Sequence, residues 1–234
     1  IYIKYKGKTQ GIIQLSREGK FFGFFGAIHT SPSFLNSLIR RFGTEKMKKN
    51  TALNIPTIYS NIFIDKEDFV YSVVGSLDPS SAAGNMYVHK LNSMGIDILK
   101  RYSSIPIYGD GPYWDFDTSR IETSYFNDIV SNNQGLFSVL DRRSGKIFTY
   151  DDNTGNLLYV FGGIGVKKGL MGLPEAVDFI YENHYIVVDS KYNQLIMFKP
   201  TYYGETVVKA VKAYHESEFD TMQKYWETAK SLSA

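Results

Sequence analysis

The side chains best suited to contact a ligand gather in one segment of the chain, residues 103–120. This segment mixes aromatic rings with carboxylates, and its candidate ligand-binding residues are Tyr108, Asp110, Tyr113, Trp114, Asp115 and Asp117. Aromatic faces stack on a sugar ring or a peptide side chain, and carboxylates accept hydrogen bonds from hydroxyl or amide groups. The pattern therefore indicates a site for a carbohydrate-like or peptide ligand. The competing interpretation is that these rings only cover a gap between neighbouring sheets.

A second set of carboxylates lies near segments that we expect to be the innermost strands of their sheets: Asp65, Asp128 and Asp178. Calcium takes about six to eight oxygen ligands, so these acids are the candidate metal-binding residues. Their spacing differs from sheet to sheet, and the competing interpretation is that they hydrogen-bond strand ends and turns. Asp141 and Asp189 end two second strands, where we expect them to accept N–H groups of the following turns.

Motifs for other kinds of chemistry are missing or incomplete. No Gly-x-Ser-x-Gly elbow occurs, and the glycine-rich segment Gly163–Gly169 leads into another strand, where a dinucleotide-binding motif would lead into a helix. The histidines do not cluster, which argues against a histidine metal site; they are His29, His89, His184 and His215. The chain has 0 cysteines, which excludes disulfides and thiolate metal sites.

Composition and charge narrow the function classes further. The 234 residues are 43% hydrophobic and 15% aromatic, enough for a sizeable core with the flat rings that suit sheets. A net charge of +2 makes a nucleic-acid partner unlikely on electrostatic grounds. Insertion 28–55 is locally basic, but its cations are expected on the solvated face of a short helix; they are Arg40, Arg41, Lys46, Lys48 and Lys49. No apolar run is long enough to span a bilayer.

The elements that must position these residues repeat along the chain. Segment Lys146–Gly163 reads as two short strands joined by a polar turn, ending on an aromatic residue and glycines, and weaker copies occupy Gly11–Ala27 and Met86–Lys100. Period-2 strands that recur in this way predict a repeat architecture of antiparallel sheets. The clearest unit has four strands, at Ser124–Asn133, Gly135–Asp141, Lys146–Asp151 and Asn156–Gly162.

The other units fit the same frame. The preceding one has strands at Asn61–Asp65, Phe69–Gly75, Met86–Asn92 and Ile96–Tyr102, and the following one at Ala176–Tyr181, Tyr185–Ser190 and Gln194–Pro200. Three more are predicted at Ile1–Tyr5, Gly11–Leu15 and Lys20–Phe25. The fold class is therefore all-β, a partial β-propeller of about four four-stranded blades. The first unit lacks its first strand and the last unit its fourth, which we expect sequence upstream of Ile1 to supply.

The C-terminal region changes period. Residues 204–233 carry apolar residues at i, i+3, i+4 and i+7, which predicts a helical hairpin with its turn at Ser217 to Phe219. The domains are thus predicted as 1–202, with insertions at 28–55 and 103–120, and 203–234. One helical pair cannot bury its own faces, so it either packs on the sheets or opens an array of helical repeats.

The segment Pro174–Pro200 resembles an NHL repeat, whose pattern is Pro, an apolar strand, a turn, a strand ending in Val-x-Asp, and then an Asn-x-Ile-x-x-Phe strand. Val187, Asp189, Asn193 and Phe198 stand at matching places, and residues 126–163 match nearly as well. The resemblance covers about Ile1 to Pro200. It implies a six-bladed type of propeller, of which this chain would supply about four blades.

The tail Ala213–Ser233 is similar to part of a tetratricopeptide repeat, with Tyr214, Phe219, Tyr225 and Ala229 at the bulky and small positions. Bacterial proteins that join an NHL propeller to helical repeats share this look. The resemblance implies an extracytoplasmic or cell-surface scaffold or recognition module, which binds a ligand or protein partner and needs no cofactor. The alternative is a calcium-dependent lactonase-like hydrolase that uses Asp65, Asp128 and Asp178 on a propeller.

Overall fold

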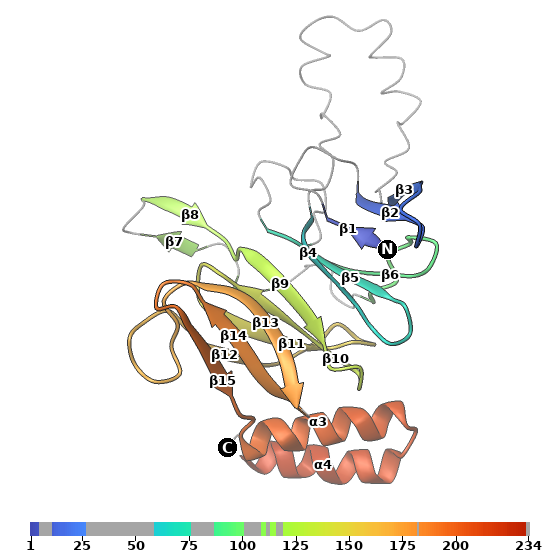
Figure 1. The fold of residues 1–234 in the computed structure, drawn as a ribbon. Helices are drawn as coiled ribbons and strands as arrows, with labels where there is room; N and C mark the ends of the chain where they lie inside the picture. The colour runs from blue at the N-terminus through green and yellow to red at the C-terminus, as the bar shows by residue number, and fades with distance from the viewer. Residues whose placement is uncertain are drawn as a thin grey trace, which may run out of the picture. The chain divides into compact units, whose positions relative to one another are not determined.

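The computed structural model describes residues 1–4, 11–26, 59–75, 87–100, 109–110, 113–115, 119–181 and 183–232. The chain divides into two compact units, Ile1–Ile58 and Tyr59–Ala234. The described residues form antiparallel sheets, followed by two helices (Figure 1). The helix and the cations expected in residues 28–55 lie outside the described residues. The mostly β fold class with a C-terminal helical pair is confirmed.

The described part of the first unit is one sheet in the order β1-β2-β3. Its strands are β1 (Tyr2–Ile3), β2 (Ile12–Leu15) and β3 (Phe21–Phe25), close to the three predicted ones. Ile12 pairs with Phe25 across the sheet, and both side chains are buried. The ring of Tyr2 packs 4.9 Å from that of Phe25, whereas Phe21, Phe22 and Phe24 are exposed.

The second unit begins with a sheet in the order β4-β5-β6: β4 (Tyr59–Ile64), β5 (Val70–Val74) and β6 (Val88–Leu91). A fourth strand was predicted at Ile96–Tyr102, but residues 96–100 form only an isolated bridge between Leu91 and Asp97. The reason is local. The Ile98 N–H still donates to the Lys90 carbonyl, but the Lys90 N–H donates to the Asp97 carboxylate, so a side chain replaces one backbone partner of a longer ladder.

The central sheet has the order β12-β11-β10-β9, and all four of its strands were predicted: β9 (Phe126–Ser131), β10 (Leu136–Asp141), β11 (Lys146–Asp151) and β12 (Leu157–Gly162). The β10–β11 register runs without a break from Leu136 opposite Asp151 to Asp141 opposite Lys146. Alternate residues of β10 enter two different cores, Val139 into one and Leu140 into the other. Burial on both faces explains why β10 is apolar along most of its length.

The third sheet has the order β13-β14-β15: β13 (Pro174–Tyr181), β14 (His184–Asp189) and β15 (Gln194–Phe198). Its three strands were predicted, with β13 beginning two residues earlier than expected. A further hairpin, β7 (Tyr113–Asp115) and β8 (Arg120–Glu122), lies within the 103–120 insertion and just beyond it. The sequence did not predict this hairpin.

The predicted helical pair is confirmed as α3 (Tyr202–His215) and α4 (Phe219–Leu232). Thr201 caps α3, because its side chain accepts the N–H of Gly204. Ser217 adopts a left-handed conformation, with a φ of 62°, between the helices. Helix α3 packs on the central sheet, since its Val208 and Val211 share a core with Leu136. Among the described residues, no helix is both long and apolar enough to cross a membrane.

The sheets of the second unit meet along their first strands. Strand β9 contacts both β4 and β13, yet each of the three strands belongs to a different sheet. Side chains, not a backbone ladder, therefore join neighbouring sheets. This arrangement agrees with blades placed side by side, although the described residues form no closed ring, and the number of blades stays a prediction.

Candidate ligand-binding site

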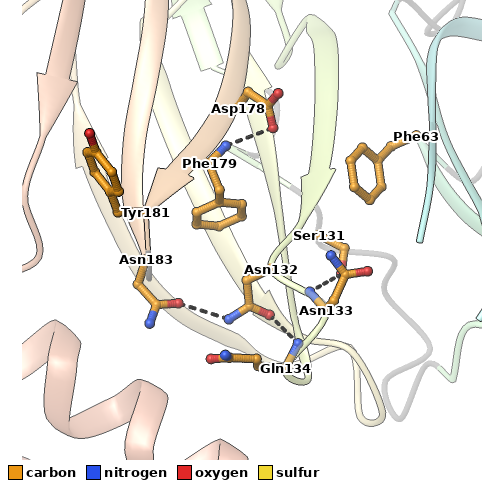
Figure 2. A pocket seen from close by; sticks show the side chains of 9 residues that line it. All are labelled: Phe63, Ser131, Asn132, Asn133, Gln134, Asp178, Phe179, Tyr181 and Asn183. Carbon is orange, nitrogen blue, oxygen red and sulfur yellow. Dashed lines mark hydrogen bonds between the residues drawn. The ribbon is translucent and has the colours of Figure 1, made fainter. Parts of the chain in front are cut away.

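A cavity of about 250 Å³ opens where the first strands of the second unit end, and we call it the inner-strand pocket (Figure 2). Its walls come from β4, from the β9–β10 turn, and from β13 with the turn that follows. The lining residues are Phe63, Ser131, Asn132, Asn133, Gln134, Asp178, Phe179, Tyr181 and Asn183. Only Asp178 of this set was a candidate site residue from the sequence.

Asparagines shape the polar side of the pocket. The Oδ1 of Asn132 accepts the N–H groups of Gln134 (2.8 Å) and Leu136 (3.1 Å), which folds the β9–β10 turn. The Nδ2 of Asn132 donates to the Oδ1 of Asn183 at 3.0 Å, so two turns from different sheets are tied together (Figure 2). Asn133 and Asn183 have φ values of 55° and 62°, a left-handed conformation that asparagine tolerates. The turn geometry thus fixes these side chains before any ligand arrives.

Several polar groups of the pocket remain available. Among the described residues, no hydrogen bond engages the side-chain amide of Gln134 or the Nδ2 groups of Asn133 and Asn183. The Asp178 carboxylate accepts the N–H of Phe179 through Oδ1 at 2.8 Å, and its side chain is exposed. No lysine or arginine of the described residues forms an ion pair with Asp178. The pocket therefore offers amide donors and one unpaired carboxylate.

The aromatic side of the pocket is rigid. The Phe179 ring packs 4.4 Å from the buried ring of Tyr185, and the Phe63 ring lies 6.4 Å from that of Tyr71. Both phenylalanines are partly buried against the cores of the unit. Tyr181 differs, because it is 73% exposed at the rim. Two fixed rings and one accessible ring give the pocket an apolar surface beside its polar groups.

Asp128 joins the three first strands. It is 7% exposed and accepts three hydrogen bonds, from the Asn61 Nδ2 of β4 (2.7 Å), the Ile129 N–H of β9 (2.9 Å) and the Val177 N–H of β13 (2.8 Å). Burial raises the pKa of Asp128 to about 6, against the opposite influence of these hydrogen bonds. The charge of Asp178 also raises the pKa of Asp128. The network holds the strands that line the pocket.

The expected calcium ligands do not form a common site in the described residues. Asp65 folds the β4–β5 turn, where its Oδ1 accepts the N–H groups of Glu67 and Phe69. Both oxygens of Asp128 are used by the strand network, whereas Asp178 lines the pocket. No group of three His, Asp or Glu side chains among the described residues could hold a metal ion. The lactonase alternative therefore gains no support from this geometry.

The ligand-binding residues expected in the 103–120 insertion are described only in part. The Asp110 carboxylate accepts a hydrogen bond from the Lys146 Nζ at 2.9 Å. The backbone N–H of Asp110 donates to the Ser124 hydroxyl. Tyr113, Trp114 and Asp115 form β7, of which the backbone alone is described. Tyr108 and Asp117 lie outside the described residues. A site in this insertion stays a prediction.

The turn carboxylates behave as expected. Asp141 accepts the N–H groups of Tyr125 and Arg143, and Asp189 accepts those of Gly172, Leu173 and Lys191. Burial by itself raises the pKa of Asp189, but the backbone N–H donors outweigh it and hold that pKa below its usual range. The structural role inferred for these repeated acids is confirmed.

A buried Ser–His–Asp series occurs in the β4–β6 sheet. Ser72 pairs with His89 across β5 and β6, and the His89 Nδ1 lies 2.8 Å from the Asp97 Oδ2. Within the described part of the chain, the Ser72 hydroxyl and the His89 Nε2 have no hydrogen-bond partner. Ser72 exposes 0% of its surface and His89 only 3%, so a substrate has no access to the hydroxyl. The series does not constitute an active site.

The residues that sequence reasoning missed are the asparagines and Gln134 of the two turns. The available signal was the recurrence of asparagine directly after the first strands, at Asn132, Asn133 and Asn183. These residues were interpreted only as strand boundaries. Which asparagines line the same pocket depends on how the sheets contact one another. The sequence of a single turn does not predict that contact.

The chain is thus rich in β structure, and in its second unit three sheets meet along their first strands and are followed by a helical hairpin. In comparisons with known proteins, no protein-family model matches the chain and no curated protein matches it.

Proposed function

We propose that this protein is a non-enzymatic recognition module of the NHL-propeller kind, which binds a ligand or protein partner in the inner-strand pocket. The observation that carries the proposal is the pocket itself. Among the described residues, the side-chain amide of Gln134 and the Nδ2 groups of Asn133 and Asn183 have no hydrogen-bonding partner, and the Asp178 carboxylate has no cationic partner. Pre-organised polar groups beside apolar rings are the usual composition of a binding site.

The propeller interpretation is supported by how the sheets are built. In each of the three first strands, an Asn or Asp side chain accepts the N–H of the next residue: Asn61 from Ile62, Asp128 from Ile129 and Asp178 from Phe179. A device repeated at the meeting line of successive sheets is expected of successive blades. The NHL resemblance and the tetratricopeptide resemblance of the tail remain part of this proposal.

Recognition is favoured over catalysis by the chemistry of the lining. The titratable side chains among the described residues of the lining are Asp178 and Tyr181. Acid–base catalysis needs a proton donor and acceptor within reach of one reacting group, and nucleophilic catalysis needs a base beside the nucleophile. An exposed carboxylate with a tyrosine at the rim supplies neither pair.

The helical hairpin is placed to pass a binding event to a partner. His215, the last residue of α3, packs so closely on Gly135 that a Cβ added there would lie 2.4 Å from the His215 Cδ2. Gly135 follows Gln134 in the turn that lines the pocket. A change in that turn on ligand binding therefore acts directly on the end of α3.

The absence of cysteine from the sequence allows a direct test of the pocket. A Tyr181→Cys variant labelled with an environment-sensitive fluorophore reports ligand at the rim. The matched control is Tyr202→Cys, because Tyr202 is similarly exposed on α3. The panel contains sugars, amino acids, short peptides and nucleotides.

We expect at least one compound to change the emission of the label at 181 in a saturable manner and to leave the label at 202 unchanged. Asn183→Ala, made in the labelled background, should weaken that response. If no compound produces a response specific to position 181, the pocket is not a recognition site and the proposal fails.

A further inference from the structure

The inner-strand pocket selects for groups that both donate and accept hydrogen bonds. Among the described residues, no bond engages the Gln134 amide, which has N–H donors beside a carbonyl oxygen, or the Nδ2 donors of Asn133 and Asn183, and Asp178 adds acceptor oxygens. A hydroxyl is at once a donor and an acceptor. The several hydroxyls of a sugar ring can therefore bond to both the amide and the carboxylate groups of the lining.

The charge of the lining excludes an anionic ligand. Among the described residues that line the pocket, Asp178 is the one formally charged residue, and none is a lysine or arginine. Phosphate and carboxylate groups are recognised by cations, above all by arginine. A negatively charged ligand would meet a like charge with nothing to offset it.

A cationic ligand fits the carboxylate but not the amides. Ammonium and guanidinium groups have N–H donors and no acceptor. The amide N–H groups of Asn133, Gln134 and Asn183 would then face a ligand that cannot accept their hydrogen bonds. Donors that lose water without gaining a partner weaken binding. The lining therefore favours a neutral ligand over a positive one.

The apolar part of the pocket suits the C–H face of a sugar ring. Figure 2 shows the rings of Phe63 and Phe179 toward one end of the pocket and the amides of Gln134 and Asn183 toward the other. A pyranose has the same two-sided character, with C–H groups on its faces and hydroxyls on its edge. Aromatic faces pack on such apolar surfaces, while the edge remains free for polar contacts.

The size of the pocket agrees with a small ligand. About 250 Å³ lies just below the usual range for small-molecule sites, about 300–1,000 Å³. One sugar unit, either free or at the end of a longer glycan, suits this volume better than an extended peptide does.

We propose that the inner-strand pocket binds a neutral, polyhydroxylated ligand of the carbohydrate class, with Asp178 and the amides of Asn183 and Gln134 on its hydroxyls. This inference rests on the proposed recognition function of the same pocket. It concerns the ligand class alone, so the two can fail separately.

The experiment compares two groups of probes by titration calorimetry on the full chain. The neutral group is glucose, galactose, mannose, maltose and cellobiose, and the cationic group is arginine methyl ester and tetralysine. The variants are Asp178→Asn, which keeps the shape and removes the charge, and Asn183→Ala. The matched control is Asn153→Ala, an asparagine in a turn outside the pocket.

We expect at least one neutral sugar to bind, with a Kd on the order of 1 mM or lower. Asn183→Ala should raise that Kd about tenfold or more, since it removes a hydrogen-bonding group, while Asn153→Ala should leave it unchanged. Asp178→Asn should raise it by less than about tenfold, because an amide oxygen still accepts from a hydroxyl. The Kd should hardly change between low and high salt, since a neutral ligand is not screened.

The opposite pattern overturns the inference. Binding of a cationic probe alone, lost in Asp178→Asn and weakened by salt, would assign the pocket to cations while leaving its recognition function intact. If neither group binds, the carbohydrate assignment fails, and the fluorescence panel then decides whether the recognition function fails with it.

Discussion

Asp128 is the residue on which the pocket walls depend most. Its carboxylate is nearly inaccessible and accepts hydrogen bonds from three strands of three sheets. Ionisation of a buried carboxyl costs free energy, and the raised pKa records that this cost exceeds what the three donors return. The folded protein therefore binds a proton at Asp128 more readily than the unfolded chain does.

We therefore expect the contribution of Asp128 to the free energy of unfolding to fall as the pH rises. The pKa of Asp128 is about 6 in the fold and about 3.9 in an unfolded chain, so its contribution to stability is fully present below about pH 4 and is lost as the pH rises to about 6. The loss should amount to about 2–3 kcal/mol. Urea denaturation of the wild type between pH 4 and pH 7, measured against Asp128→Asn, isolates the contribution.

The Asp128→Asn variant should be less stable overall, because an amide cannot accept from all three donors, but it should lack this downward slope. Parallel pH profiles for the two proteins would show that Asp128 titrates alike in the folded and unfolded states.

Asp189 should have the opposite pH dependence. Its folded pKa is lowered, so its contribution to stability is present at neutral pH and is lost as the pH falls below the unfolded value of about 3.9 and through the folded pKa. Asp189→Asn removes one of the two acceptors that hold Gly172 and Leu173, which should cost about 1–3 kcal/mol at pH 7. Thermal melts at pH 7 and pH 3 check both statements, and a variant as stable as the wild type at pH 7 would contradict them.

At the scale of elements, the hairpins were predicted well because each strand carries its own signal. Strand β11 has the predicted ends, Lys146 and Asp151. Its residues are mostly buried, and polar turns containing glycine bound it on both sides. The bridge at Asp97 and the hairpin β7–β8 were not predicted. In the first case a side chain replaced a backbone partner, and in the second the aromatic residues that we had assigned to a ligand site also have high strand propensity.

The sequence of a single strand does not predict how that strand packs against a neighbouring sheet. The Tyr185 hydroxyl of β14 lies 2.9 Å from the Ser138 hydroxyl and 3.1 Å from that of Thr149, both in the central sheet. Tyr185→Phe leaves these buried hydroxyls with one partner fewer and should lower the free energy of unfolding by about 1–2 kcal/mol. Tyr202→Phe is the control and should cost almost nothing, because Tyr202 is exposed at the start of α3. Equal effects of the two substitutions would mean that the hydroxyl cluster does not stabilise the contact between the sheets.

The contact between α3 and the β9–β10 turn gives an element-scale prediction with a close control. Gly135 and Gly169 have φ values of 96° and 87°, but only at Gly135 would a Cβ meet other atoms, with the His215 ring at 2.4 Å. Both Ala variants pay for the left-handed backbone, about 1 kcal/mol, and Gly135→Ala must also displace the end of α3. Gly135→Ala should therefore melt at a clearly lower temperature than Gly169→Ala. Equal melting temperatures would exclude a tight contact there.

At the scale of the whole molecule, the open question is where the cooperative units divide. The sequence predicts a boundary at residues 202 and 203, between sheets and helices. Yet Val208 and Val211 of α3 share a core with Leu136 of the central sheet, and both helices belong to the unit Tyr59–Ala234. The change of period marks a change of secondary structure, and whether it also marks a domain is decided by shared burial, which one sequence does not reveal.

Native-state hydrogen exchange can separate these cases. Because the core is shared, we expect the amides of α3 and of β10 to exchange through the same opening, with equal free energies and equal dependence on denaturant. Exchange of α3 at a distinctly lower free energy than β10 would identify the helices as a separate domain.

In the pocket, too, the sequence predicts roles that depend on neighbouring residues but not contacts between distant segments. Asp178 was a candidate only as a calcium ligand, because it is a carboxylate near an inner strand, and the roles of Asp141 and Asp189 followed from their position before turns. The partnership of Asn132 with Asn183 joins residues 51 positions apart across two sheets. No spacing rule within one chain segment contains that information.

The joint between the sheets has a consequence for how such a gene can change. Strands β4, β9 and β13 touch through side chains such as Asp128, and no backbone ladder crosses from one sheet to the next. Duplication of one whole sheet would therefore break no backbone hydrogen bonds between strands. It would require only new side-chain contacts where the added sheet meets its neighbours. The number of sheets can therefore change during evolution while each hairpin keeps its structure.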